Sequence, residues 1–154
     1  MWQRIQTVFL VIAIISLVAT IFLPIWGNKG AEETIYELYP LHFSITKAGA
    51  KTTNYFPYCL TAVLAVASIT ISAISIRRFD NRFLQMKLGV LNSFILVGVI
   101  ASAVLMANGL IKTYGQGQYG FGLYAPGIAV ICNLLANRFI RRDEKLVRDS
   151  QRLR

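Results

Sequence analysis

Hydrophobic residues fall in four long stretches that are separated by shorter polar segments. A helix rises 1.5 Å per residue, so about 20 residues cross a hydrocarbon core of about 30 Å. Each stretch is close to that length. The runs Val8 to Ile15 and Ile95 to Leu105 are apolar on nearly every helical face, unlike an amphipathic helix of a soluble domain. We therefore predict four transmembrane helices, with spans at about 5–26, 55–76, 88–111 and 122–140.

The first stretch lies at the N-terminus, where a cleavable signal peptide is the rival interpretation. Its apolar run is longer than the usual hydrophobic region of such a peptide, about 7–15 residues, and it ends without a small-x-small cleavage site. We interpret it as a span. Pro24 marks the end of the helix, and Trp26 is an aromatic residue suited to the headgroup level.

Residues 27–54 form the longest polar segment and the predicted outer loop. The runs 34–39 and 41–46 are rich in β-formers and are interrupted by Pro40, which predicts two short strands in a hairpin. Two strands alone are marginally stable, so the hairpin needs support from the helices or from a partner.

The second outer loop, 112–121, combines glycines with tyrosines and predicts a flexible turn at the interface. Its Gly115, Gly117 and Gly120 have GxGxxG spacing. The motif follows a span and lacks a strand-turn-helix context, so it does not predict a nucleotide site.

The C-terminal segment 141–154 predicts a basic helix with Phe139, Leu146 and Leu153 at seven-residue steps. Three interpretations stay open: a solvated extension of the fourth span, a helix on the inner leaflet, and a helix docked on another protein, which we favour slightly. The candidate contacts for a partner or for lipid headgroups are Arg141, Arg142, Lys145, Leu146, Arg148, Arg152 and Leu153.

Composition agrees with membrane spans, because 55% of the residues are hydrophobic and 15% are charged, against about a quarter charged in soluble domains. The net charge is +9, but the basic residues flank the spans and do not form a groove with interleaved aromatics. We therefore expect membrane lipids as partners and no nucleic acid.

Charge also predicts the orientation. The side that holds both termini has 12 basic residues, Arg4, Arg77, Arg78, Arg82, Lys87, Arg138, Arg141, Arg142, Lys145, Arg148, Arg152 and Arg154. The opposite side has four, Lys29, Lys47, Lys51 and Lys112. By the positive-inside rule both termini are cytoplasmic.

No constellation of residues predicts catalysis, a metal or a cofactor. Cys59 and Cys132 lie at depths that differ by about 9 Å, whereas a disulfide needs Cα atoms within about 7 Å, so both are interpreted as packing residues. His42 has no second metal ligand nearby and is interpreted as structural. We therefore expect no enzymatic activity.

The polar residues inside the spans are amides and hydroxyls, which typically join helices to one another. Asn92 and Asn133 are predicted at similar depths, where their amides can meet. The candidate residues for polar helix packing are Asn92, Asn108, Asn133, Ser68 and Ser72.

Two terminal motifs are distinctive: Gln3-Arg4-Ile5-Gln6-Thr7-Val8-Phe9-Leu10 at the start, and Arg142-Asp143-Glu144-Lys145-Leu146-Val147-Arg148 with Arg152-Leu153-Arg154 at the end. With four spans and the Lys-x-x-Tyr, Gly, Tyr and Pro of 112–126, the chain resembles the small membrane proteins of Bacteroidetes-type bacteria catalogued as domain of unknown function 4293. The resemblance implies a four-helix inner-membrane protein whose two cytoplasmic ends matter to the family. It implies no activity and no catalytic residue.

The sequence thus predicts an all-α integral membrane protein, a four-transmembrane-helix bundle (1–140) with a short β-like outer loop and a basic cytoplasmic C-terminal helix (141–154). Our leading hypothesis is an accessory or structural subunit of a larger inner-membrane complex, bound to another membrane protein or to a second copy. The alternative is a bundle that binds a lipid, a quinone or another apolar molecule near Pro126, Gly127 and Asn133. An enzyme that acts on lipid-borne groups ranks third, because the spans lack titratable residues.

Overall fold

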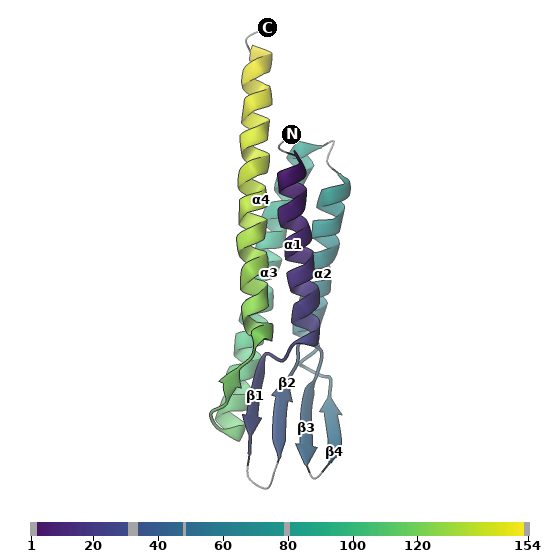
Figure 1. The fold of residues 1–154 in the computed structure, drawn as a ribbon, viewed down its shortest axis with the longest axis vertical. Coiled ribbons are helices and arrows are strands. Elements are labelled where there is room, and N and C mark those ends of the chain that lie inside the picture. The colour runs from purple at the N-terminus through teal and green to yellow at the C-terminus, as the bar shows by residue number, and fades with distance from the viewer. Residues whose placement is uncertain (1–2, 31–33, 48, 79–80, 153–154) are drawn as a thin grey trace.

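A computed structural model describes residues 3–30, 34–47, 49–78 and 81–152, and the side chains within them except those of 3–4 and 147–152. Its four helices are α1 (Gln3–Phe22), α2 (Leu60–Arg77), α3 (Arg82–Tyr114) and α4 (Phe121–Arg152). A small sheet lies at the end of the molecule opposite the two termini (Figure 1).

All four helices are long and apolar enough to cross a membrane, which confirms the prediction of four such helices. Their ends differ from the predicted spans. Helix α1 ends at Phe22, before Pro24, whose nitrogen has no hydrogen to donate to a further helical turn. Trp26 was expected at the headgroup level, but it begins a strand and is fully buried.

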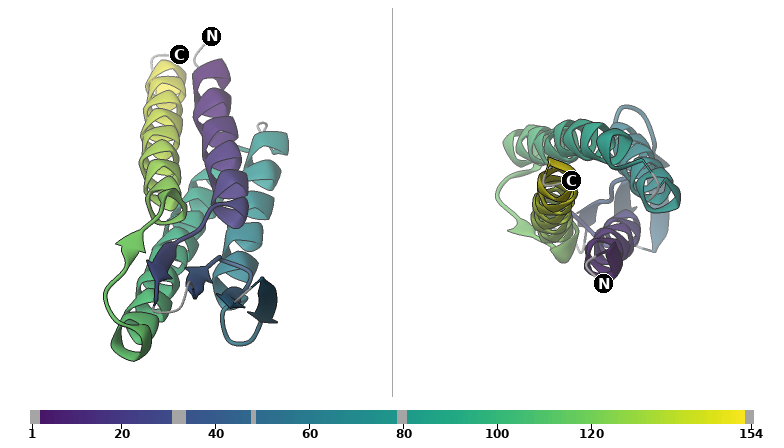
Figure 2. Two further views of the ribbon diagram at one scale, coloured as in Figure 1. Left: turned by 60° about the horizontal axis from the view of Figure 1, so that its bottom comes forward. Right: turned by 90° about the horizontal axis from the view of Figure 1, so that it is seen from above.

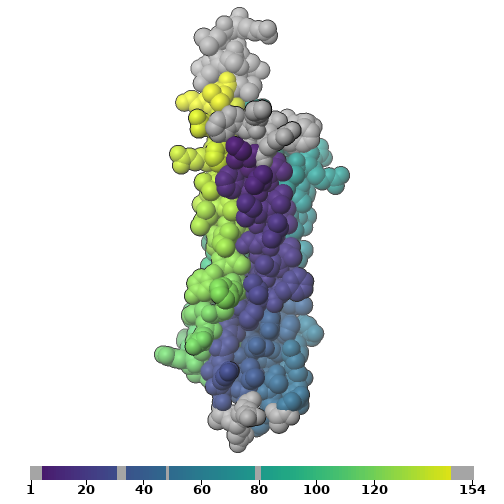
Figure 3. Space-filling model, in the orientation of Figure 1, coloured from purple at the N-terminus to yellow at the C-terminus, as the bar shows by residue number. Residues whose placement is uncertain are grey.

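The helices are joined by close contact of small side chains. Helix α1 packs on α4 and α2, while α3 packs on α2 and α4 and is inclined across the others (Figure 2). The space-filling view shows α1 and α4 side by side along the front of the molecule (Figure 3). Ala13, Ala65 and Ala129 are completely buried between the helices, together with Leu96 and Val99. Small residues at these positions let the helix backbones approach one another.

The sheet is larger than the predicted hairpin. The hairpin itself is confirmed as β2 (Ile35–Leu38) and β3 (Phe43–Lys47), which pair antiparallel. The full order is β4-β3-β2-β1-β5, with β4 at Ala50–Asn54, β1 at Trp26–Lys29 and β5 at Gln118–Tyr119. Strand β5 comes from the second outer loop, so the sheet joins both loops.

One face of the sheet packs on the outer end of α3. Trp26, Leu38 and Phe43 contact Ala107 and Leu110 of that helix in a second buried cluster. Helix α3 has 33 residues and is about 50 Å long, well beyond a hydrocarbon core of about 30 Å. This length leaves enough helix outside the other three to carry the sheet.

Helix α3 continues well past the level at which α2 begins. The hydroxyls of Thr61, at the start of α2, and Ser102 of α3 lie 3.1 Å apart, so α2 begins beside Ser102. The turns of α3 beyond Ala103 support the sheet. Ile111, where the predicted third span ends, packs against this same cluster, so the sheet covers one side of the helix there.

Gly117 and Gly120 of the second outer loop are packed closely, and residues 118–119 between them form a strand where a turn was expected. A Cβ atom at Gly117 would collide with the carbonyl of Gly27 and with the Trp26 indole, and one at Gly120 would collide with the Pro24 carbonyl. The Gly120 amide donates to the Ile25 carbonyl at 2.9 Å. The loop therefore lies directly against β1.

Replacing Gly117 with Ala should destabilise the protein by about 1–3 kcal/mol, because the added methyl group has to displace a backbone carbonyl or a buried indole. Gly109→Ala is the matched control, since nothing lies within 4 Å of its Cβ position and Ala favours a helix by up to about 1 kcal/mol. Thermal unfolding in mild detergent measures both. Equal midpoints for the two variants would contradict the close approach.

Candidate functional site

A buried amide of α3 connects three helices. Asn92 is 1% exposed, and its Oδ1 accepts a hydrogen bond from the Ser68 hydroxyl at 2.7 Å. Its Nδ2 donates to the Ser72 hydroxyl at 3.0 Å and to Oδ1 of Asn133 at 3.1 Å. The structure thus brings together four of the five residues that the sequence suggested for polar helix packing.

The side chain of Asn133 on α4 is also fully used in hydrogen bonds. Its Nδ2 donates to the Gly89 carbonyl at 3.1 Å and to the Ser93 hydroxyl at 2.9 Å. Both amide hydrogens of Asn133 are therefore used within the protein, and it offers no free donor to a ligand between the helices. Ser68 and Ser72 are at most 1% exposed, so a dimer cannot form through them.

Asn108 does not join helices. It is exposed, and its Oδ1 accepts from the Tyr119 hydroxyl of β5 at 3.5 Å. The reason is its place on the outer end of α3, beyond the ends of the other helices, where the neighbours are strands.

The two cysteines are free. Cys132 is buried in the helical core, whereas Cys59 is the N-cap residue of α2 and half-buried, not inside the span as predicted. Helix α2 begins five residues later than the predicted span, at Leu60, where the Ala62 amide donates to the Pro40 carbonyl of the outer loop at 3.1 Å.

Contacts at the end of the bundle that carries the termini hold α4 as far as Asp143. Gln6 of α1 donates to Oδ2 of Asp143 at 2.8 Å, and Arg82 of α3 donates to the Asp143 carbonyl at 3.2 Å. The rings of Phe9 and Phe139 stack with centroids 5.6 Å apart. The predicted boundary at residue 140 therefore falls within the packed part of α4.

Beyond Asp143, α4 continues as one helix to Arg152 and extends past the other helices (Figure 1). Leu146 is 56% exposed. Among the other candidate contacts, the structure shows Arg141, Arg142 and Lys145 exposed. The side chains of Arg148 and Arg152, and Leu153 altogether, lie outside the described part of the chain.

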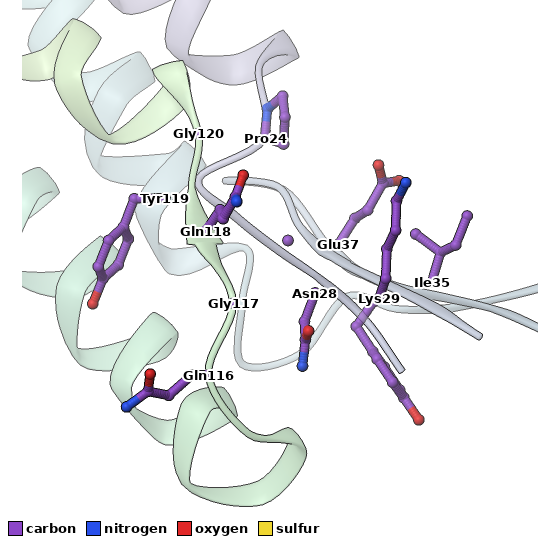
Figure 4. A pocket seen from close by; sticks show the side chains of 12 residues that line it. Pro24, Asn28, Lys29, Ile35, Glu37, Gln116, Gly117, Gln118, Tyr119 and Gly120 are labelled. Carbon is purple, nitrogen blue, oxygen red and sulfur yellow. The ribbon is translucent and has the colours of Figure 1, made fainter. Parts of the chain in front are cut away.

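A hollow of about 630 Å³ lies on the sheet where β1, β2 and residues 116–120 meet (Figure 4). Lys29, Ile35 and Glu37 point to the same side of the sheet there. Asn28, also in its wall, donates to the Tyr114 carbonyl at 2.8 Å and so completes the end of α3. Sequence reasoning missed this hollow, because two loops about 90 residues apart in the chain form it.

His42 is held between the rings of Tyr39 and Tyr55, with centroids 5.1 and 5.8 Å away. Its Nδ1 is buried without a hydrogen-bond partner among the described residues. Burial lowers the pKa of His42, the charge of Lys51 lowers it further, and Glu37 opposes the shift. Burial, with a contribution from Glu37, raises the pKa of Tyr39.

The described residues contain no group of three or more His, Cys, Asp and Glu side chains that could hold a metal ion. The interior hydrogen bonds serve packing, and the outer hollow offers a cation, a carboxylate and amides that suit recognition.

The model of a domain of unknown function, DUF4293, matches residues 2–153. The chain belongs to the DUF4293 family. The match covers nearly the whole chain and confirms the resemblance that the terminal motifs indicated. No curated protein was found to match the sequence of this DUF4293 member.

The amide network allows a test by a double-mutant cycle. Asn92→Ala and Asn133→Ala should each destabilise the protein by about 1–3 kcal/mol, because each leaves buried partners unsatisfied. Their coupling energy should be about 0.6 kcal/mol and at most about 1.7 kcal/mol, as for other hydrogen bonds between membrane helices. Unfolding in detergent measures all three variants. Asn108→Ala is the exposed control and should change stability by less than about 0.5 kcal/mol. If the effects of Asn92→Ala and Asn133→Ala were strictly additive, that result would contradict the direct hydrogen bond between the two amides.

His42 should make the protein less stable in mild acid. Because its pKa is lowered in the folded protein, the unfolded chain takes up a proton first, near the ordinary histidine pKa of about 6.5. Stability is therefore lost as the pH falls through about 6.5 towards the folded pKa. Thermal midpoints between pH 7.5 and 5 should fall more steeply for the wild type than for His42→Gln, which lacks this group. Parallel curves would show that His42 makes no contribution.

Proposed function

We propose that this protein is an accessory subunit of a larger complex in a bacterial inner membrane, anchored by its four helices with both termini in the cytoplasm. Four candidate spans and the excess of basic residues at the ends that carry the termini support this orientation. In this orientation the sheet lies outside the membrane and the free end of α4 lies in the cytoplasm.

The observation that carries the proposal is the extension of α4 beyond every other helix (Figure 1). From Glu144 to Arg152 the extension is about 13 Å long. Asp143 fixes its direction through the contacts with Gln6 and Arg82. A helix that leaves the bundle with fixed direction and with an exposed leucine is suited to dock on another protein.

The sequence of the extension indicates the chemistry of the partner. Leu146 and Leu153 are seven residues apart and give a short apolar seam, and basic residues flank that seam. The partner that fits is a protein whose cytoplasmic helix or groove has an apolar seam beside acidic residues. Because α4 continues without a break, the extension leads away from the leaflet, which disfavours a helix lying on the membrane surface.

The second candidate function, binding of an apolar molecule, finds no support inside the bundle, where Asn133 is fully hydrogen-bonded. Two hollows on the exposed surface of α3 and α4 favour a lipid there.

Affinity purification from native membranes in a mild detergent tests the accessory-subunit proposal. The wild type should copurify with a stoichiometric protein, and deletion of residues 146–154 should abolish this copurification. The deletion begins after the contacts of Asp143, so it leaves the packed part of α4 intact. Mass spectrometry of the eluates identifies and quantifies the partner.

Two point variants make the comparison sharper. Leu146→Glu should reduce copurification, because it places a carboxylate in the apolar seam. Leu41→Glu changes a leucine of similar exposure on the opposite side, and it should leave copurification unchanged. Recovery of the chain alone in every preparation, or the same loss in both variants, would overturn the proposal, and a second copy as the only partner would replace it with a homo-oligomer.

A further inference from the structure

Two adjacent hollows lie on the exposed surface of α3 and α4, near the end of the bundle that carries the termini. Their volumes are about 510 and 340 Å³, and they share Val90, Phe94 and Arg141. Together they form one shallow groove, which we call the α3–α4 groove. It lies on the exposed surface of the bundle, apart from the hollow on the sheet, and its wall includes Ser93, whose hydroxyl accepts a hydrogen bond from Asn133 of the Asn92 network.

The walls of the α3–α4 groove are apolar and exposed. Phe94 is 73% exposed, Leu134 54% and Leu91 50%, and Phe83 and Val90 continue the surface. In the proposed orientation Leu91, Phe94 and Leu134 face the acyl chains of one leaflet, where contact with hydrocarbon costs nothing. Phe83 lies in the first turn of α3, nearer the termini. The groove can therefore hold an acyl chain along its length.

Cations gather at one end of this groove. Lys87, Arg138 and Arg141 line it, all three are exposed, and none of the described residues that line it is acidic. Arg138 and Arg141 are three residues apart and so share a helix face. Lys87 lies over the Phe83 ring, 4.6 Å from its centroid, which keeps its ammonium group at the groove.

The level of these cations matches the phosphate region of a leaflet. Arg138 lies 17 residues after Phe121, the first residue of α4, which is about 26 Å along the helix. A hydrocarbon core of about 30 Å that begins near Phe121 ends close to Arg138. Phe94 lies seven residues after Lys87, about 10 Å deeper on the acyl-chain side.

We propose that the α3–α4 groove binds an anionic phospholipid of the leaflet on the side of the termini. Arg138 and Arg141 contact its phosphate, Lys87 contributes a third cation, and one acyl chain lies against Phe94 and Leu134. Basic pockets between membrane helices hold anionic headgroups in this way. The proposal rests on the membrane embedding proposed above and does not depend on the protein partner.

Native mass spectrometry of the full chain in mild detergent tests this site. The protein is titrated with phosphatidylglycerol and, separately, with phosphatidylcholine of the same acyl chains. Wild type should bind phosphatidylglycerol more tightly. Arg138→Gln combined with Arg141→Gln should weaken that binding about 25-fold, at about 5-fold per cation at low salt, and leave phosphatidylcholine binding unchanged.

The matched control is Arg77→Gln combined with Arg78→Gln. These arginines are exposed at the same end of the molecule but belong to the end of α2, and neither lines the groove. The control has the same net charge as the test variant and should bind phosphatidylglycerol like the wild type. Equal affinity of the wild type for the two lipids, or equal losses in the two double variants, would overturn the proposal.

Two further measurements separate the sources of a failure. Glycerol phosphate without acyl chains should not compete with the lipid, and full competition would show an anion site that does not use the groove.

Membranes are also washed with alkaline carbonate. Release of the chain by that wash would refute the membrane embedding itself, whereas loss of the protein partner on deleting 146–154 with lipid binding retained would confirm that the two surfaces act independently.

Discussion

A buried amide needs a hydrogen-bond partner inside the protein when no water can reach it, and in this chain that requirement aligns three helices. Asn92 reaches Ser68 and Ser72 of α2 and Asn133 of α4, so sliding any one of these helices would leave donors unpaired. Gly89 of α3 permits the same alignment of α3 and α4, because a Cβ atom there would collide with the side chain of Asn137 on α4. Polar bonds and a small residue thus specify a single register where apolar packing alone would tolerate several.

That register decides what lies outside the bundle. With α2 beginning beside Ser102, the outer end of α3 is left uncovered by helices, and its apolar face needs another layer. The sheet supplies this layer, and Tyr36, Phe43 and Tyr114 extend the contact with rings whose centroids are 4.5–6.5 Å apart. The second outer loop lies against β1 only because glycine stands at Gly117 and Gly120. The sheet is therefore a consequence of the length of α3.

At the end that carries the termini, the molecule has two surfaces with different chemistry. The free end of α4 beyond Asp143 is basic and bears an exposed leucine, which suits a protein partner. The α3–α4 groove has apolar walls and a cluster of cations, which suits an anionic lipid. In the proposed orientation the first surface lies in the cytoplasm and the second in the leaflet, so a lipid and a partner could bind at once. Arg141 lines the groove and lies three residues before Glu144, so the two surfaces adjoin.

Local pattern was sufficient for the helices, for the β2–β3 hairpin and for the shared depth of Asn92 and Asn133, because hydropathy, β-propensity and rise per residue act within one segment. Tertiary contacts decided the rest. Trp26 resembles an interfacial aromatic in the sequence, yet the sheet buries it, and Asn108 resembles Asn133 but lies beyond the helical core. Strand β5 and the α3–α4 groove have no local signal, since each forms only when segments distant in the chain come together. The sequence by itself determined which segments are helical and apolar, and only the packing of those helices decided which face is buried by protein and which is left for lipid or a partner.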